Sequence, residues 1–293
     1  MTIPEEDRPY GGLPGAEIVG LRNSQIQLAV AEVRYQHVGD IGSPQALRIR
    51  DALVRAGVEV IHVESTQRHE FTLAVADAVA VPQATATTGW VLSDESRTLT
   101  VSLFPDLAFV QATAYTRYGE TLRPSLQGVL HGLSEVFAPG LVQRVGLRYV
   151  NRLTNPSARA AADWQGSIDP AFLGVLADGL LGARVQSTQQ QVEVALEVGV
   201  GALVRHGAFI DHAVGGSYSY LVDIDVFRQV TDAFEPDAVL AVARRLNRTA
   251  LPLFQHVVHA DYRETMGPEP LERSETDPGH ERAGEPRPEG ELP

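Results

Sequence analysis

The sequence predicts an α+β protein with a mainly antiparallel, curved sheet that carries long helices on one face. Short alternating segments joined by turns follow one another through 89–115, which is typical of an antiparallel meander. Apolar residues recur at helical spacing in 120–137 and again in 236–262. Each half of the chain also repeats one order: strand, helix, three or four strands, long helix. These observations together predict a pseudo-duplicated fold.

The first half begins with a β-rich run at 25–36. A Ser-Pro pair then starts a helix that ends at Gly57. Apolar runs at 58–63 and 69–81 predict one further strand each. The segment 89–115 adds three short strands, separated by turn-forming residues, at 90–93, 98–104 and 108–113.

The second half starts with a strand at 144–153, followed by a loop and a short helix that opens at Asp169. Residues 184–199 alternate as a strand, and two more strands follow at 202–210 and 217–227. The long helix of 236–262 should be kinked at Pro252, because proline removes a backbone donor.

We expect one α+β domain over 23–265, made of the pseudo-repeats 23–140 and 141–265. Residues 1–22 show Pro and Gly pairs before any periodic pattern, so we expect a flexible N-terminus. Residues 266–293 hold eight acids and three arginines among few apolar residues, which predicts a disordered acidic tail. The order of elements is analogous to the TATA-binding-protein-like arrangement, where two halves share a curved sheet; the analogy carries no function.

The amino-acid composition excludes or disfavours several classes of function. The chain has 293 residues, a net charge of −13 and no cysteine, which excludes disulfides, thiolate metal sites and cysteine nucleophiles. All 24 basic residues are arginine, so no lysine can act as a base or form a Schiff base. The negative charge disfavours nucleic acid as a partner. No apolar run approaches the ~20 residues that span a bilayer, and no signal peptide is evident, so we expect a cytoplasmic protein without a membrane partner.

The strand at 144–153 places Arg144, Arg148 and Arg152 on one face. Such a row of guanidinium groups suits a phosphate, a carboxylate or an acidic peptide. Pairing with acids on neighbouring strands is the alternative that we favour, at ~0.2–1 kcal/mol for each pair. The acids that share a strand face and suit such pairing are Asp223 and Asp225, or Glu193 and Glu197.

Asp223 and Asp225 lie ~7 Å apart on one side of their strand, a separation that also suits metal binding or acid–base catalysis. We assign no catalytic residue, and keep these two acids with the three arginines as candidate ligand- or partner-binding residues. Trp90 joins them because an indole at the start of a hairpin strand can stack on a ligand, although a position at the edge of the core is more typical.

His256 and His259 are weak metal candidates, since they lie three residues apart on a predicted helix. A metal needs at least one more ligand, and the sequence offers no second histidine pair. We therefore expect no metal and no cofactor. Ser, His and Asp residues also gather in 206–220, but without a nucleophile elbow, and we interpret that segment as a glycine-rich hairpin loop.

Several motifs resemble a sporadically distributed bacterial family of unknown function. They are the first strand at 26–35, the hairpin GWVLSDESRTLTVSLFPD, the strand RVGLRYVNRL, and YLVDIDVF with the helix ending in FQHVVHADYRETMG. The resemblance spans most of 25–267 but matches nothing in 64–86 and 155–185. It supports the boundaries of the fold and implies no reaction and no catalytic residue.

From these observations we predict a non-enzymatic cytoplasmic binding or regulatory module that recognises a protein partner or a second copy of itself. The sporadic distribution of the family suggests the hypothesis of a laterally transferred defence or toxin-neutralising operon. The alternative is a protein that binds a small anionic molecule, or an enzyme, with its site between the sheet and the helices.

Overall fold

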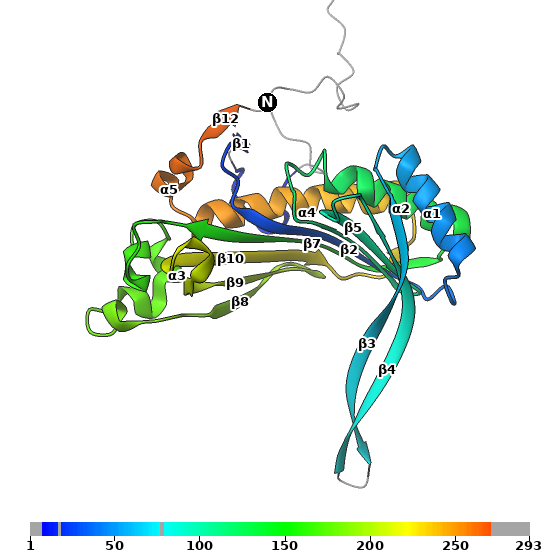
Figure 1. Ribbon diagram of the computed structural model, residues 1–293, viewed down its shortest axis with the longest axis horizontal. Coiled ribbons are helices and arrows are strands. Elements are labelled where there is room, and N and C mark those ends of the chain that lie inside the picture. The colour runs from blue at the N-terminus through cyan, green and yellow to red at the C-terminus, as the bar shows by residue number, and fades with distance from the viewer. Residues whose placement is uncertain (1–7, 17–18, 77–78, 271–293) are drawn as a thin grey trace, which may run out of the picture.

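The computed structural model describes residues 8–16, 19–76 and 79–270 and has the predicted α+β fold. Within the described residues the main sheet has ten strands, and all neighbouring strands in it are antiparallel. Figure 1 shows that this sheet is curved and does not close on itself. The strand order is β3-β4-β5-β6-β2-β7-β10-β9-β8, with β11 beside β7.

The strands of the main sheet are β2 (Ile26–Tyr35), β3 (His62–Ala76), β4 (Val79–Ser93), β5 (Leu99–Phe104), β6 (Leu107–Ala112), β7 (Leu141–Thr154), β8 (Gln190–Glu197), β9 (Val200–Asp211), β10 (Ser217–Arg228) and β11 (Asp232–Ala233). The α-helices are α1 (Ser43–Arg55), α2 (Leu122–Phe137), α3 (Pro170–Leu173), α4 (Pro236–Val257) and α5 (Ala260–Thr265). Short 3-10 helices are η2 (Tyr10–Gly12), η3 (Ala161–Trp164), η4 (Gly174–Ala177), η5 (Gly182–Arg184) and η6 (His212–Val214).

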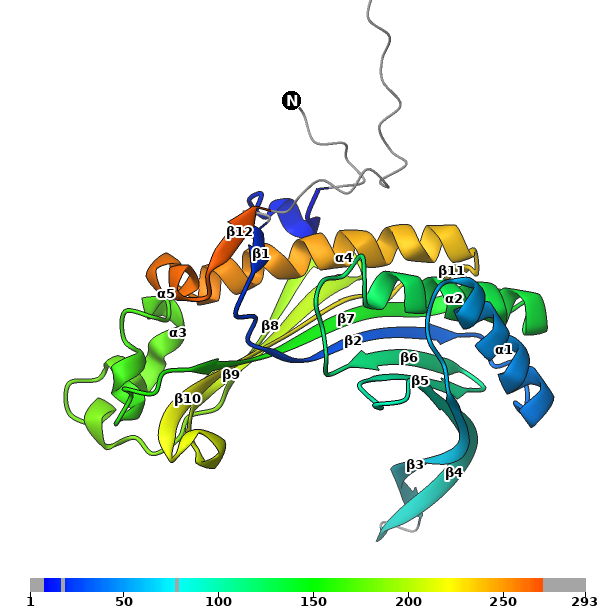
Figure 2. The ribbon, with the colours of Figure 1, turned by 45° about the horizontal axis from the view of Figure 1, so that its top comes forward.

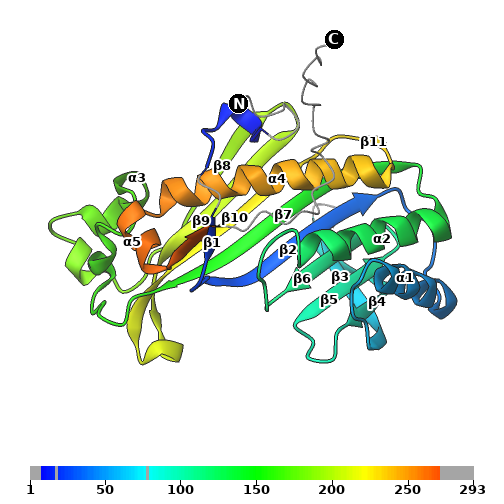
Figure 3. The same cartoon turned by 90° about the horizontal axis from the view of Figure 1, so that it is seen from above.

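The two halves of the chain meet at the antiparallel pair β2–β7 in the middle of the sheet. Strands β6, β5 and β4 follow outward from β2, and β10, β9 and β8 follow outward from β7. The helices α2 and α4 lie side by side on one face of this sheet, with α1 packed beside α2 (Figures 2 and 3). The second half has short helices between β7 and β8 where the first half has α1.

Strand alternation decides which side chains enter the core. On β2 every second residue is buried toward the helices, namely Ala29, Ala31, Val33 and Tyr35. On β7 the corresponding set is Val145, Leu147, Tyr149 and Leu153. These side chains pack against the apolar faces of α2 and α4, and removing their apolar surface from water stabilises the fold.

The helix pair α1–α2 depends on close approach at a glycine. A Cβ atom added at Gly128 would lie 2.7 Å from the Cα atom of Leu53 on α1. Non-bonded carbon atoms do not approach this closely, so any side chain at this position would clash with α1. Glycine at this position of α2 therefore brings the two helix backbones together, at some cost in helix propensity.

The first half differs from the sequence prediction in its outer strands. Residues 58–61 are not in a strand, since β3 starts at His62. The run 69–81 is not one strand either, because the chain reverses between Ala76 and Val79; residues 77 and 78 lie outside the described residues. This run contains no Gly or Pro before residue 82, so the sequence gives no turn signal there. The β3–β4 hairpin projects from the body of the sheet (Figure 1), since only Trp90–Ser93 of β4 pairs with β5.

Short elements occur in both segments that the sequence predicts to be loose. Strand β1 (Val19–Leu21) pairs with β12 (Pro268–Pro270) in a small second sheet on the helix side (Figure 2). Tyr10 of η2 is buried, and the Arg245 guanidinium lies 3.7 Å from its ring centroid. Backbone pairing and one aromatic anchor thus order residues whose composition favours disorder, and residues 1–7 and 271–293 lie outside the described residues.

The last long helix is shorter than predicted. Helix α4 continues through Pro252 but ends at Val257, and a separate helix, α5, starts at Ala260 with His259 at its N-cap. Within the described residues, no helix combines the length and the apolar character that crossing a bilayer requires.

Replacing Gly128 with Ala should destabilise the protein by roughly 1–3 kcal/mol, because α1 and α2 must separate to admit the new methyl group. Urea unfolding measures this loss. The matched control is Gly119→Ala, where an added Cβ meets nothing within 4 Å. Equal stability of the two variants would show that the helices do not need this close approach.

Candidate functional site

The face of the main sheet that is turned away from α1, α2 and α4 carries polar and charged side chains, and we call it the open face. Its central part is hollowed by about 670 Å³ over β6, β2, β7 and β10. The hollow combines apolar with charged and amide side chains and is lined by Leu28, Val30, Glu32, Arg34, Leu107, Phe109, Gln111, Gln143, Arg144, Gly146, Arg148, Asp225 and Gln229.

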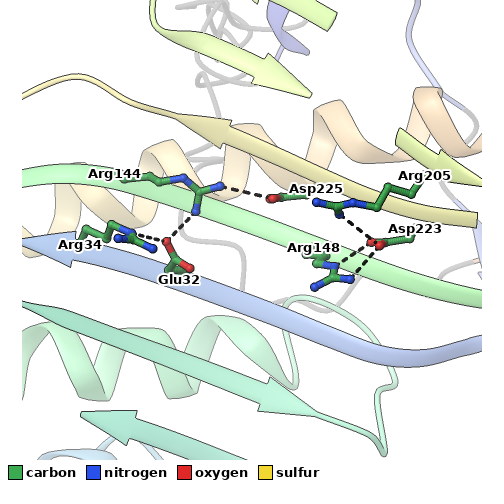
Figure 4. A network of polar contacts seen from close by, with 7 residues as sticks. All are labelled: Glu32, Arg34, Arg144, Arg148, Arg205, Asp223 and Asp225. Atoms are coloured by element: carbon green, nitrogen blue, oxygen red, sulfur yellow. Dashed lines mark hydrogen bonds and ion pairs between the residues drawn. The ribbon is translucent and has the colours of Figure 1, made fainter. Parts of the chain in front are cut away.

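The best-satisfied ion pair of this face joins Arg148 on β7 to Asp223 on β10 (Figure 4). The Arg148 Nε and Nη2 atoms donate to the two carboxylate oxygens, each at 2.7 Å. Arg205 of β9 donates to the same carboxylate at 3.2 Å. The Asp223 side chain is only 3% exposed, and its hydrogen bonds to Arg148 raise the pKa of that guanidinium. Three charge-assisted hydrogen bonds offset the free-energy cost of burying the Asp223 carboxylate.

Arg144 bridges two carboxylates from the strands on either side of β7 (Figure 4). It donates to Glu32 of β2 at 2.7 Å and to Asp225 of β10 at 3.3 Å. Its guanidinium also lies 4.9 Å from the ring centroid of Phe227. Burial raises the pKa of the Asp225 carboxyl, and the charge of Arg144 only partly opposes this effect.

Two guanidinium groups of the open face are more exposed than the carboxylates that pair with them. Arg34 is 52% exposed and Arg148 is 42% exposed, whereas Asp223 is nearly covered. The network drawn in Figure 4 contains four arginines and three carboxylates. An approaching molecule therefore meets the guanidinium groups of Arg34 and Arg148 before the carboxylate of Asp223. Three of the other charged groups are about equally covered: Arg144 is 18% exposed, Glu32 24% and Asp225 20%.

Arg152, the third arginine of the predicted row, lies further along β7 and does not line the hollow. Its Nε atom lies 3.6 Å from the buried carboxylate of Asp211. That carboxylate also accepts hydrogen bonds from the Ser219 hydroxyl at 2.8 Å and from the backbone N–H of Ala213 at 3.0 Å. Asp211 thus closes the β9–β10 loop and orders that end of the sheet.

The other candidates lie elsewhere in the fold. The Trp90 indole N–H donates to the carbonyl of Ile41 at 2.7 Å, and the ring packs at the edge of the core. His256 packs against the Phe172 ring, with ring centroids 5.5 Å apart, and His259 caps α5. Among the described residues, no group of three or more His, Cys, Asp or Glu side chains is arranged to hold a metal ion.

The sequence prediction omitted three members of the network: Glu32, Arg34 and Arg205. Alternation along 25–36 places Glu32 and Arg34 on one strand face, so the signal for two of them was present. Glu197, proposed as a partner for the arginine row, instead contacts Arg245 of α4 at 3.3 Å. It lies on β8, which is separated from β7 by two strands.

No protein-family model matches the chain, and no curated protein does. A solved structure of S. pombe Pct1 RNA triphosphatase aligns at 7% sequence identity, covering 80% of this chain and 84% of that chain, with a TM-score of 0.13. Similarity this low carries no argument, and membership of the bacterial family that the motifs resemble stays a prediction.

Asp223→Asn should cost roughly 2–3 kcal/mol at pH 7, because Arg148 and Arg205 lose their shared charged acceptor. Asp225→Asn should cost less than about 1 kcal/mol. The pKa of the Asp225 carboxyl is raised in the folded protein. Ionisation of this group therefore lowers the free energy of unfolding as the pH rises, and the charge that Asn removes is not a stabilising one. Urea unfolding at pH 7 compares the two variants. A larger loss for Asp225→Asn would contradict this ranking.

The buried His206 should make the protein sensitive to acid. Its Nδ1 lies 2.8 Å from the Tyr220 hydroxyl, and burial lowers the pKa of the imidazole from 6.5. A lowered folded-state pKa adds stability above pH 6.5, which is lost as pH falls below that value. The free energy of unfolding should therefore fall between pH 7 and pH 5 more steeply in the wild type than in His206→Gln. Parallel profiles would show that another group sets the acid sensitivity.

Proposed function

We propose that this protein is a non-enzymatic binding module that recognises a protein partner on the open face of its sheet. The observation that carries the proposal is the hollow of about 670 Å³, in which apolar side chains and half-exposed guanidinium groups lie side by side. Arginine and aromatic residues next to apolar surface are typical of the centres of protein–protein interfaces.

The position of the open face supports a macromolecular partner. The hollow spans four neighbouring strands on the face turned away from the helices, so a second chain can approach it without any rearrangement of the core. Central strands held on both sides by neighbours form a rigid surface, which lowers the entropy that binding must overcome.

The alternative of an anion site between the sheet and the helices is disfavoured. Arg144 and Arg148 line the hollow on the open face, and Arg152 contacts Asp211 on the strand face opposite the buried core residues of β7. The three arginines are therefore not available to a ligand that enters between the layers.

Because the chain has no cysteine, one introduced thiol can report on a single surface. We expect Gln111→Cys, which lies in the hollow, to cross-link to the partner in lysate of the native host after labelling with a thiol-reactive photo-cross-linker. Mass spectrometry of the cross-linked peptide identifies both the protein and the attached segment. Adding unlabelled wild-type protein should compete and abolish the cross-link.

The matched control is Val54→Cys on α1, whose side chain is 53% exposed on the helix side. This variant should not capture the protein that Gln111→Cys captures. The proposal fails if both variants capture the same proteins, if only Val54→Cys captures one, or if unlabelled protein does not compete.

A further inference from the structure

The two halves of the sheet place an arginine at the same point of β2 and β7. Glu32 and Gly146 face each other in the β2–β7 register, and they begin the segments EVRYQ and GLRYV. The third residue of each segment is an arginine, Arg34 or Arg148, followed by a buried tyrosine. The two arginines therefore occupy equivalent places on either side of the point where the halves meet.

Their neighbours on the next strand outward differ in chemistry. Arg148 faces Asp225 of β10 in register, whereas Arg34 faces Leu107 of β6. The first half thus has an apolar side chain where the second half has a carboxylate. Within the described residues Arg34 hydrogen-bonds through Nε to Glu32, which also accepts from Arg144. The half-exposed guanidinium of Arg34 shares one carboxylate and lies beside apolar surface.

The hollow therefore has a half-exposed guanidinium group at each of two ends, and the Phe109 ring lies beside Glu32 between them. Arg34 lies beside Arg144, and Arg148 lies beside Val30, so the two cationic ends are four residues apart along the strands, or about 13 Å. Between them Phe109 faces Glu32 on one side, and Gly146 contributes no side chain on the other. A Cβ atom added at Gly146 would lie 2.7 Å from the Nη1 atom of Arg144, so glycine at this position makes room for the guanidinium group.

We propose that this hollow binds an extended acidic segment of the partner with the pattern acid–x–apolar–x–acid, an inference that rests on the proposed function. In an extended chain, residues i, i+2 and i+4 point to one side and span about 13 Å. The two carboxylates reach Arg34 and Arg148, and the apolar side chain between them covers Phe109. Arg34 and Arg148 are each more exposed than the carboxylate they pair with, so their guanidinium groups can also receive the partner's carboxylates.

The probe is a fluorescein-labelled peptide, Gly-Ser-Glu-Ser-Leu-Ser-Glu-Ser-Gly, titrated with full-length protein and followed by anisotropy. Replacing both Glu with Gln should weaken binding about tenfold, since the charge-assisted hydrogen bonds are lost. Exchanging the Leu for Ser, or moving the two Glu to adjacent positions, should weaken binding several-fold. Added salt should weaken the Glu peptide much more than the Gln peptide.

Arg34→Ala is the informative variant, because Glu32 keeps Arg144 as its partner and no buried charge is left alone. We expect it to weaken the Glu peptide about tenfold with an unchanged melting temperature. The control is Arg50→Ala on α1, whose ion pair is with its neighbour Asp51 on the other side of the sheet. It should bind the peptide as the wild type does.

Equal binding of the Glu and Gln peptides, or no effect of Arg34→Ala, would overturn the inference. Tighter binding of a nine-nucleotide oligothymidylate, or full displacement of the peptide by millimolar inorganic phosphate, would overturn it in favour of a phosphate site. The proposed function is judged separately by the Gln111→Cys cross-link. A partner captured there through a segment without the acidic pattern refutes the inference and leaves the proposed function standing.

Discussion

A sheet covered by helices on only one face must sort its side chains by strand alternation, and the antiparallel pair β2–β7 is where this constraint acts most strongly. Odd-numbered residues of β2 enter the core, and the even-numbered residues between them reach the open face. A shift of one residue in this register would bury Glu32 and Arg34 and expose Val33 and Tyr35. The register therefore fixes both the core and the composition of the surface.

The charges of the open face follow from this arrangement. Asp223 sits in the middle of a ten-stranded sheet with almost no access to water, so its charge requires Arg148 and Arg205. The Arg34 and Arg148 side chains reach past the carboxylates of Glu32 and Asp223, so their guanidinium groups stay half-exposed on an acidic protein. Where β6 supplies Leu107 instead of an acid, Arg34 lies beside an apolar side chain of the hollow. The proposed binding surface thus consists of residues that also form structural ion pairs.

Much of this arrangement can be predicted from sequence, because period-two alternation is a local signal. It places Arg144 and Arg148 on one strand face and Asp223 and Asp225 on another, and the structure joins them. It cannot show which strands are neighbours, so it predicts Glu197 as a possible partner of the arginine row, whereas the structure places Glu197 beside Arg245.

The missed features have physical reasons of the same kind. The β3–β4 reversal has no Gly or Pro signal, and the pairing of β1 with β12 joins residues about 250 positions apart in segments with little apolar content. The hollow itself requires side chains from four strands that are distant in sequence. Its apolar members, such as Leu107 and Phe109, look like ordinary strand residues when considered alone.

The most direct test of the central claim changes the charge of the hollow at one position without disturbing the network. Gln111 lines the hollow and faces Val30, which in turn lies beside Arg148. The affinity for the acidic Glu peptide should fall about three- to tenfold in Gln111→Glu and should rise in Gln111→Arg. A charge placed ~8 Å from the carboxylates of the bound peptide changes the binding free energy by about 1 kcal/mol. Equal affinities in the two variants, with both proteins folded, would contradict a cationic open face as the binding surface.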